Sequence, residues 1–138
     1  MTPVIDAWSQ SPNELFMNQP WLATLLRWTR QEGLGAVPVE ATLKAMDDAG
    51  VERALMCAWS GPQGMLVTND EVAALVARHP DRFVGVAAVD LRQPVAALRE
   101  LRRAVDLGAV ALRIVPWLWN LPPDDRRYYP LYAACSEL

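Results

Sequence analysis

Short runs of continuous apolar residues alternate with segments of helical periodicity, and this alternation constrains the fold more than any other feature. Apolar runs of strand length begin near residues 52, 83 and 110, so that successive repeats are 31 and 27 residues long. A strand that is apolar along its whole length is buried on both faces, as in a parallel sheet covered by helices. The pattern therefore predicts an α/β fold built from a parallel β/α repeat.

The first repeat is expected to carry an insertion. We expect a strand at about 3–8, an insertion at 9–38, and three further β/α units at about 52–138, together forming a single partial barrel domain over residues 1–138. The insertion contains apolar residues that favour a short amphipathic helix, which would act as a lid or plug one end of the fold. These residues are Trp21, Leu22, Leu25, Leu26 and Trp28.

Several residues mark the expected ends of helices. Thr68 and Glu71 have the spacing of a capping box, which predicts a helix directly after Thr68. Pro94 suits the first turn of a second helix, which Gly108 would close. Residues 116–129 are expected to form a long loop before a last helix that begins at Pro130.

The number of repeats suggests half of a barrel. The chain has 138 residues, well short of the roughly 250 residues of a typical eight-fold β/α barrel. Four β/α units would supply the first half of such a TIM barrel and leave both edge strands unpaired. A small doubly wound domain is the alternative, and a sequential strand order would favour the half barrel over it.

Composition excludes several classes of partner. The chain has 13 basic and 16 acidic residues, with no basic patch of the kind that binds nucleic acid. No apolar run is long enough to span a membrane, and the first residues lack a secretory signal. Cys57 and Cys135 have no metal-ligand spacing and are expected to be buried thiols. We therefore expect a cytoplasmic protein without nucleic-acid or membrane partners.

Four of the six tryptophans follow the predicted strands at their carboxyl ends, where ligands bind in parallel α/β folds. They are Trp8, Trp59, Trp117 and Trp119. One interpretation is that they fill the core beneath the loops. The other is that they line an apolar pocket for a planar or hydrophobic substrate.

Arg113 is the most informative charged residue. Strand alternation directs Leu112 and Ile114 toward the helices, which leaves Arg113 on the opposite side of the sheet. A buried guanidinium needs an anionic partner, because an unpaired one costs several kcal/mol. Asp6 and Asp90 are the candidate partners within the chain, and a substrate carboxylate is the functional alternative.

The same two aspartates are candidate catalytic residues. Burial can raise the pKa of a carboxyl group toward neutrality, which would suit acid–base work by Asp6 or Asp90, although a structural role is the competing interpretation. His79, the single histidine, lies at a predicted helix end and is expected to be structural. No metal site is predicted, since no residues have the spacing of zinc ligands.

Several segments together resemble the amidohydrolase-related family, which includes metal-dependent hydrolases, lactonases and aryl or dicarboxylate decarboxylases. The resemblance covers residues 4–6, 43–51, 69–85, 111–116 and 129–132. It implies a (β/α)₈ barrel of which this chain supplies the N-terminal half. In the family, a His-x-His pair at the end of the first strand binds a catalytic metal. The corresponding residues here are Trp8 and Gln10, which are respectively unable and poorly suited to bind metal.

The resemblance implies a hydrolase or decarboxylase that acts on a small carboxylated or cyclic substrate. Arg113 would bind the substrate anion, and Asp6 and Asp90 would orient these groups or take part in proton transfer. The pocket would be shaped by Trp8, Gln10, Trp59, Trp117 and Trp119.

The chain alone is expected to lack a complete active site. The partner would be the missing C-terminal half or, in a homo-oligomer, a second copy. No cofactor is expected in this chain, and a divalent metal such as zinc would require ligands from the missing half. The alternative function is a non-catalytic half barrel that binds a ligand or dimerises.

Overall fold

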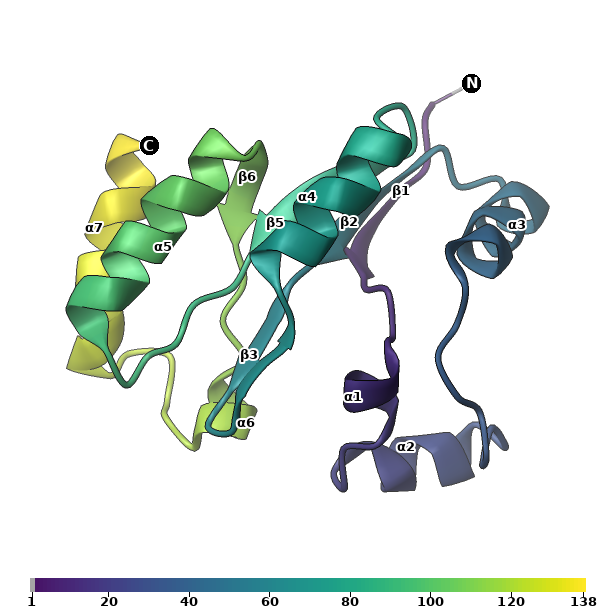
Figure 1. The fold of residues 1–138 in the computed structure, drawn as a ribbon, viewed down its shortest axis with the longest axis horizontal. Helices are drawn as coiled ribbons and strands as arrows, with labels where there is room; N and C mark the ends of the chain where they lie inside the picture. Colours follow the sequence, from purple (N-terminus) through teal and green to yellow (C-terminus); the bar gives the residue numbers. More distant parts are fainter. Residues whose placement is uncertain (1) are drawn as a thin grey trace.

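The computed structural model describes residues 2–138 and is built on a four-stranded parallel sheet (Figure 1). Its strands are β1 (Ile5–Ser9), β2 (Arg53–Cys57), β5 (Phe83–Ala87) and β6 (Ala109–Leu112). They lie side by side in the order in which they occur along the chain. This sequential order confirms the half barrel and excludes the doubly wound alternative.

A longer helix follows each of these strands. They are α3 (Val39–Ala49), α4 (Asn69–Arg78), α5 (Pro94–Asp106) and α7 (Tyr129–Glu137). The capping box of α4 is confirmed, because the Thr68 side chain accepts from the Glu71 amide and the Glu71 carboxylate accepts from the Thr68 amide. Pro94 begins α5 as predicted. The local signals in the sequence therefore set the helix starts correctly.

The insertion forms the short helix that its apolar residues predicted and a second short helix that was not predicted. They are α2 (Leu22–Trp28) and α1 (Glu14–Met17), respectively. Phe16 and Leu22 are buried in the core, whereas Leu25 and Trp28 are exposed. In Figure 1, α1 and α2 lie at the same end of the molecule as β3 (Trp59–Gly61) and α6 (Pro116–Trp119). The chain reaches this end as it leaves the carboxyl end of β2.

A β-hairpin follows β2 that was not predicted. The apolar run ending at Trp59 was expected to form one strand, but the chain divides it into β2 and β3 (Trp59–Gly61), which pairs antiparallel with β4 (Gly64–Val67). Pro62 and Gln63 make the turn, and Gly64 adopts a φ of 116° that side chains disfavour. The hairpin is too short for its periodicity to be visible in the sequence.

Residues 116–129 are more ordered than the predicted long loop. They contain α6 and a 3₁₀ helix, η1 (Arg126–Tyr128). The Tyr128 side chain is fully buried, and its hydroxyl donates to the Leu121 carbonyl at 3.2 Å. The hydrogen bond closes the segment on itself, and the buried Tyr128 ring packs the segment against the apolar cluster of α5 and α7.

The core consists of two apolar clusters. One lies around β2, α4 and the insertion, and includes Met56, Phe83 and Trp59. The other joins the end of β5 to α5 and α7, and includes Leu101 and Leu131. In residues 2–138, none of the helices combines the length and the apolar character that crossing a membrane requires.

Candidate functional site

An aromatic cluster forms where the insertion, the hairpin and α6 meet. The rings of Trp21 and Trp59 are stacked, with centroids 5.5 Å apart and planes 11° apart. Trp117 meets Trp21 edge-on at 5.2 Å, and Phe16 meets Trp59 edge-on at 5.0 Å. Aromatic pairs prefer these stacked and edge-on arrangements. Three separate segments thus build one apolar wall at the carboxyl end of the sheet.

Arg113 lies between two indole rings on the side of the sheet away from α5 and α7. Its Cζ atom is 3.6 Å from the ring centroid of Trp8 and 3.9 Å from that of Trp59. Leu112 and Ile114 pack on the opposite side with the α5 and α7 cluster, as alternation predicted. Cation–π contacts of this kind stabilise the positive charge of the guanidinium against the faces of the two rings.

The guanidinium has no anionic partner among residues 2–138. Its Nε, Nη1 and Nη2 atoms are buried and make no hydrogen bond, and Arg113 as a whole is 8% exposed. Burial lowers the pKa of Arg113, yet a guanidinium stays protonated in proteins. The neighbouring Cys57 thiol is no counter-charge, since burial raises its pKa. The structure therefore holds an unpaired buried cation.

The ion pair from Arg113 to Asp6 or Asp90 does not form, so that alternative is wrong. Asp6 accepts a hydrogen bond from the Trp8 amide at 2.9 Å, in a stretch where a register shift between Asp6 and Ser9 interrupts the β1–β2 pairing. Asp90 is bound by the guanidinium of Arg92.

Asp90 is fixed in the loop between β5 and α5. Hydrogen bonds from Arg92 hold the pKa of this carboxyl below its usual range, so the group is ionised at neutral pH rather than poised as an acid. Arg92 also donates to the Pro62 carbonyl in the turn of the hairpin. This contact joins two loops at the carboxyl end of the sheet.

The remaining predicted site residues lie apart from Arg113 or contact it only through other side chains. Trp117 joins the aromatic cluster through Trp21, whereas Trp119 packs with the α5 and α7 cluster. Gln10 and Asp6 line a shallow hollow against α3. Several other buried polar atoms have no hydrogen-bond partner in the described chain: Gln10 Oε1, Trp21 Nε1, Arg53 Nε, Trp59 Nε1 and Ser60 Oγ.

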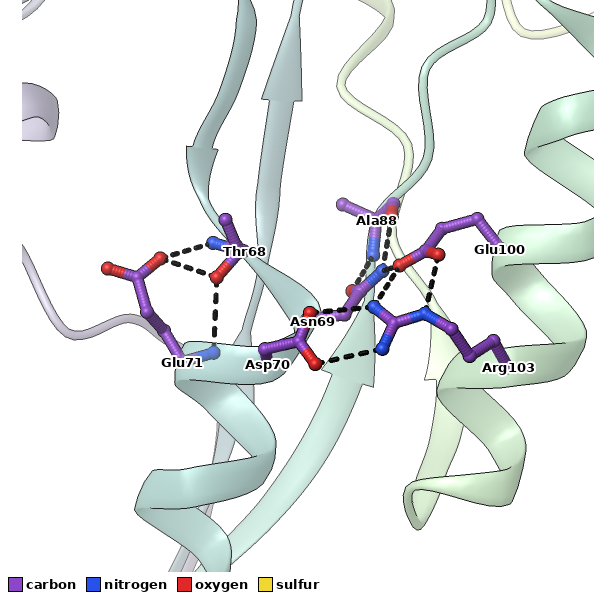
Figure 2. Close-up of polar contacts among 7 residues, drawn as sticks. All are labelled: Thr68, Asn69, Asp70, Glu71, Ala88, Glu100 and Arg103. Carbon is purple, nitrogen blue, oxygen red and sulfur yellow. Dashed lines mark hydrogen bonds and ion pairs between the residues drawn. The ribbon is translucent and has the colours of Figure 1, made fainter.

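Asn69, at the start of α4, was missed by the sequence analysis. Its side chain accepts from the Ala88 amide and donates to the Ala88 carbonyl, each at 2.9 Å, directly beyond β5 (Figure 2). It also donates to Glu100, which Arg103 links in turn to Asp70. The network joins α4 to α5 and fixes where the chain leaves β5. In the sequence, the only indication of this role was the position of the asparagine directly after Thr68, which caps the helix.

The family model of amidohydrolases matches residues 35–138, which is most of the chain. The protein therefore belongs to the amidohydrolase family. Gamma-resorcylate decarboxylase of Rhodococcus jostii is 37% identical over 84 residues, covering 51% of this chain and 24% of that enzyme. The chain thus matches about a quarter of the length of its curated relatives.

Solved structures give the same fold. A TIM-barrel protein of Bordetella bronchiseptica superposes with a TM-score of 0.76 and 28% identity, over 99% of this chain and 52% of that one. A dihydroxybenzoic acid decarboxylase of Polaromonas, solved with bound manganese and an inhibitor, gives a TM-score of 0.68 at 23% identity, over 99% and 47%. The chain spans about half of each barrel, so its fold is that of half a TIM barrel.

The residues at the end of β1 do not fit the metal that the family implies. The resemblance implies that Trp8 and Gln10 correspond to the His-x-His pair, and these side chains are poor metal ligands. The guanidinium of Arg113 lies beside them, with its Cζ atom 3.6 Å from the ring centroid of Trp8. No three His, Cys, Asp or Glu side chains within residues 2–138 come together as a metal site would require. A fixed positive charge at this position repels a divalent cation.

Proposed function

We propose that the chain is the N-terminal half of an amidohydrolase-family enzyme that decarboxylates or hydrolyses a small carboxylated aromatic or cyclic substrate. The family match and the likeness to decarboxylases support the reaction class. The unpaired, buried guanidinium of Arg113 is the observation that carries the proposal. A substrate carboxylate is the partner that this cation lacks.

Energetics support a ligand role for Arg113. A buried charge without a partner costs several kcal/mol, and two cation–π contacts of about 1–2 kcal/mol each offset only part of that cost. A carboxylate can accept two parallel hydrogen bonds from a guanidinium, the strongest neutral-pH pairing available to it. The folded chain therefore carries the unfavourable free energy of a buried, unpaired guanidinium, and binding of a carboxylate would remove it.

The aromatic cluster supports a planar substrate. Trp59 contacts Arg113 with its ring and packs against Trp21, so the cation and the apolar wall are continuous. A ring bearing a carboxylate matches both features at once. In this proposal Trp117 shapes the outer part of the pocket through its contact with Trp21. Trp119, Gln10 and Asp6 lie apart from Arg113 and are not assigned to the pocket, and Asp90, held ionised by Arg92, positions the adjoining loop.

Catalysis at the proposed site needs further chain, whereas the groups proposed to bind the carboxylate, Arg113 and Trp59, lie within this chain. Strands β1 and β6 each pair on one side only within the described sheet. Ile5 on β1 and Val110 on β6 are 54% and 68% exposed. The proposed partner is the C-terminal half of the barrel or a second copy of this chain. The same exposed edges favour the second candidate function, a half barrel that dimerises without catalysis.

Titration calorimetry tests the proposed function. The chain, with manganese present, is titrated with 2,6-dihydroxybenzoate and separately with resorcinol, which is the same ring without its carboxylate. We expect binding of the carboxylate at one site per chain and binding of resorcinol at least about tenfold weaker. Equal affinity for the two ligands, or none for either, would contradict the proposal. Light scattering on the same sample separates a dimer from a monomer.

A further inference from the structure

The end of β1 in this chain lies beside a positive charge, because Arg113 Cζ is 3.6 Å from the ring centroid of Trp8. The resemblance implies that Trp8 occupies the first position of the family's metal-binding His-x-His pair. The Polaromonas decarboxylase carries manganese. This chain therefore has a cation beside a residue that the resemblance assigns to the family's metal-binding pair and that cannot itself bind metal.

We propose that Arg113 replaces the divalent metal as the group that receives the substrate carboxylate, and that this site is therefore metal independent. The inference rests on the proposed function and specifies how its substrate is held. A bound metal neutralises and orients a carboxylate, and a guanidinium does both through two parallel hydrogen bonds. A guanidinium does not generate hydroxide from water as a metal does. Because it carries a fixed positive charge, the proposed site binds anions and repels metal cations.

Trp8 is the movable cover of this site. The guanidinium nitrogens are buried although the Trp8 side chain is itself largely exposed, at 60%. Trp59, on the other side of the guanidinium, is 4% exposed and held by Trp21 and Phe16. A carboxylate thus reaches Arg113 when the Trp8 ring moves away, while Trp59 stays as the platform. Binding exchanges one exposed cation–π contact for charged hydrogen bonds.

The test uses the chain after treatment with EDTA. Uptake of manganese is followed by the electron paramagnetic resonance signal of the free ion, and binding of 2,6-dihydroxybenzoate by calorimetry without metal. We expect no uptake of manganese and binding of the carboxylate at one site. Arg113→Met is expected to weaken this binding by about 10- to 100-fold. Arg102→Met, at an exposed position of α5, is the matched control and should bind normally.

Two further variants keep the test informative if Arg113→Met fails to fold, which circular dichroism detects. Arg113→Lys keeps the charge and loses the paired hydrogen bonds, so it should bind more weakly than the original chain but still without metal. Trp8→Ala removes the cover and should tighten binding by about two- to fivefold. Weaker binding by Trp8→Ala would overturn the role of Trp8 as a cover.

The outcomes separate this inference from the proposed function. Stoichiometric uptake of manganese, or carboxylate binding that appears only with manganese, would overturn the inference and leave the proposed function standing. Failure to bind the carboxylate both with and without manganese would overturn the proposed function and the inference with it. Binding without metal that Arg113→Met weakens would support both.

Discussion

The guanidinium of Arg113 stacks on the ring of Trp59, with its Cζ atom 3.9 Å from the ring centroid, and both side chains are buried. This relationship joins the end of β6 to the hairpin that follows β2. It places a cation without a counter-ion against an aromatic wall. Replacement of Arg113 is therefore expected to weaken carboxylate binding without lowering the free energy of unfolding.

Replacing Arg113 should not destabilise the fold. Arg113→Met removes an unpaired buried charge and keeps most of the apolar volume, a change that is often neutral or stabilising by about 1–4 kcal/mol. Loss of the two cation–π contacts opposes this gain. We expect a free energy of unfolding equal to or up to about 2 kcal/mol above that of the original chain, measured by urea denaturation. A loss of more than about 2 kcal/mol would show that the guanidinium is structurally paired.

Replacing Asn69 should destabilise the fold. Asn69→Ala leaves the amide and carbonyl of Ala88 without their partners in a buried position. Each unsatisfied group costs about 1–3 kcal/mol, so we expect a loss of roughly 2–4 kcal/mol in urea denaturation. The matched control is Asp70→Ala, which removes an exposed ion pair with Arg103 and should cost less than about 1 kcal/mol. Similar losses for both variants would argue against the role assigned to Asn69.

Acid should weaken the network between α4 and α5. Hydrogen bonds from Arg103 are the main cause that lowers the pKa of Asp70 and of Glu100 in the folded chain. A carboxyl group with a lowered folded pKa stabilises the fold above its unfolded pKa, and this contribution is lost as the pH falls through the folded pKa. Stability should therefore decline below about pH 5.

Arg103→Met provides the check on this pH dependence. Without the guanidinium, both carboxyl groups should titrate nearer their ordinary values, so the fall in unfolding free energy between about pH 5 and pH 3 should be shallower. Urea denaturation at four pH values measures the slope. An unchanged slope would mean that other carboxyl groups, such as Asp90 beside Arg92, dominate the acid response.

The hairpin should be sensitive to volume at Gly61. A Cβ atom at this position would lie 2.9 Å from Cδ2 of Leu118 in α6. Gly61→Ala is expected to cost about 1 kcal/mol, because Leu118 must shift to make room. In the background of Leu118→Ala the same substitution should cost little, and a double-mutant cycle of denaturation experiments measures the coupling. Additive effects would show that the hairpin and α6 do not pack closely in solution.

The sequence predicted those features that local chemistry determines. The capping box at Thr68, the helix start at Pro94 and the direction of Arg113 each follow from neighbouring residues, and the structure confirms all three. The resemblance to the amidohydrolase-related family is confirmed by the match over residues 35–138. The β/α repeat alone left a doubly wound sheet open, and the sequential strand order of the structure excludes it.

The features that were missed depend on contacts between distant parts of the chain. The hairpin after β2 is stabilised by packing of Gly61 against Leu118, which no local pattern reveals. The link from Asn69 to Ala88 spans 19 residues. The expected ion pair to Arg113 failed because Asp90 is bound by its near neighbour Arg92. Sequence reasoning identified the buried cation but not its lack of a partner.

A crystal structure of the chain grown with 2,6-dihydroxybenzoate in the presence of EDTA tests directly whether Arg113 binds the carboxylate without metal. We expect a carboxylate whose oxygens lie about 2.7–3.0 Å from the guanidinium nitrogens of Arg113, with the Trp8 ring displaced and Trp59 unmoved. A guanidinium still enclosed by both rings, with the ligand absent or bound elsewhere, would contradict this expectation.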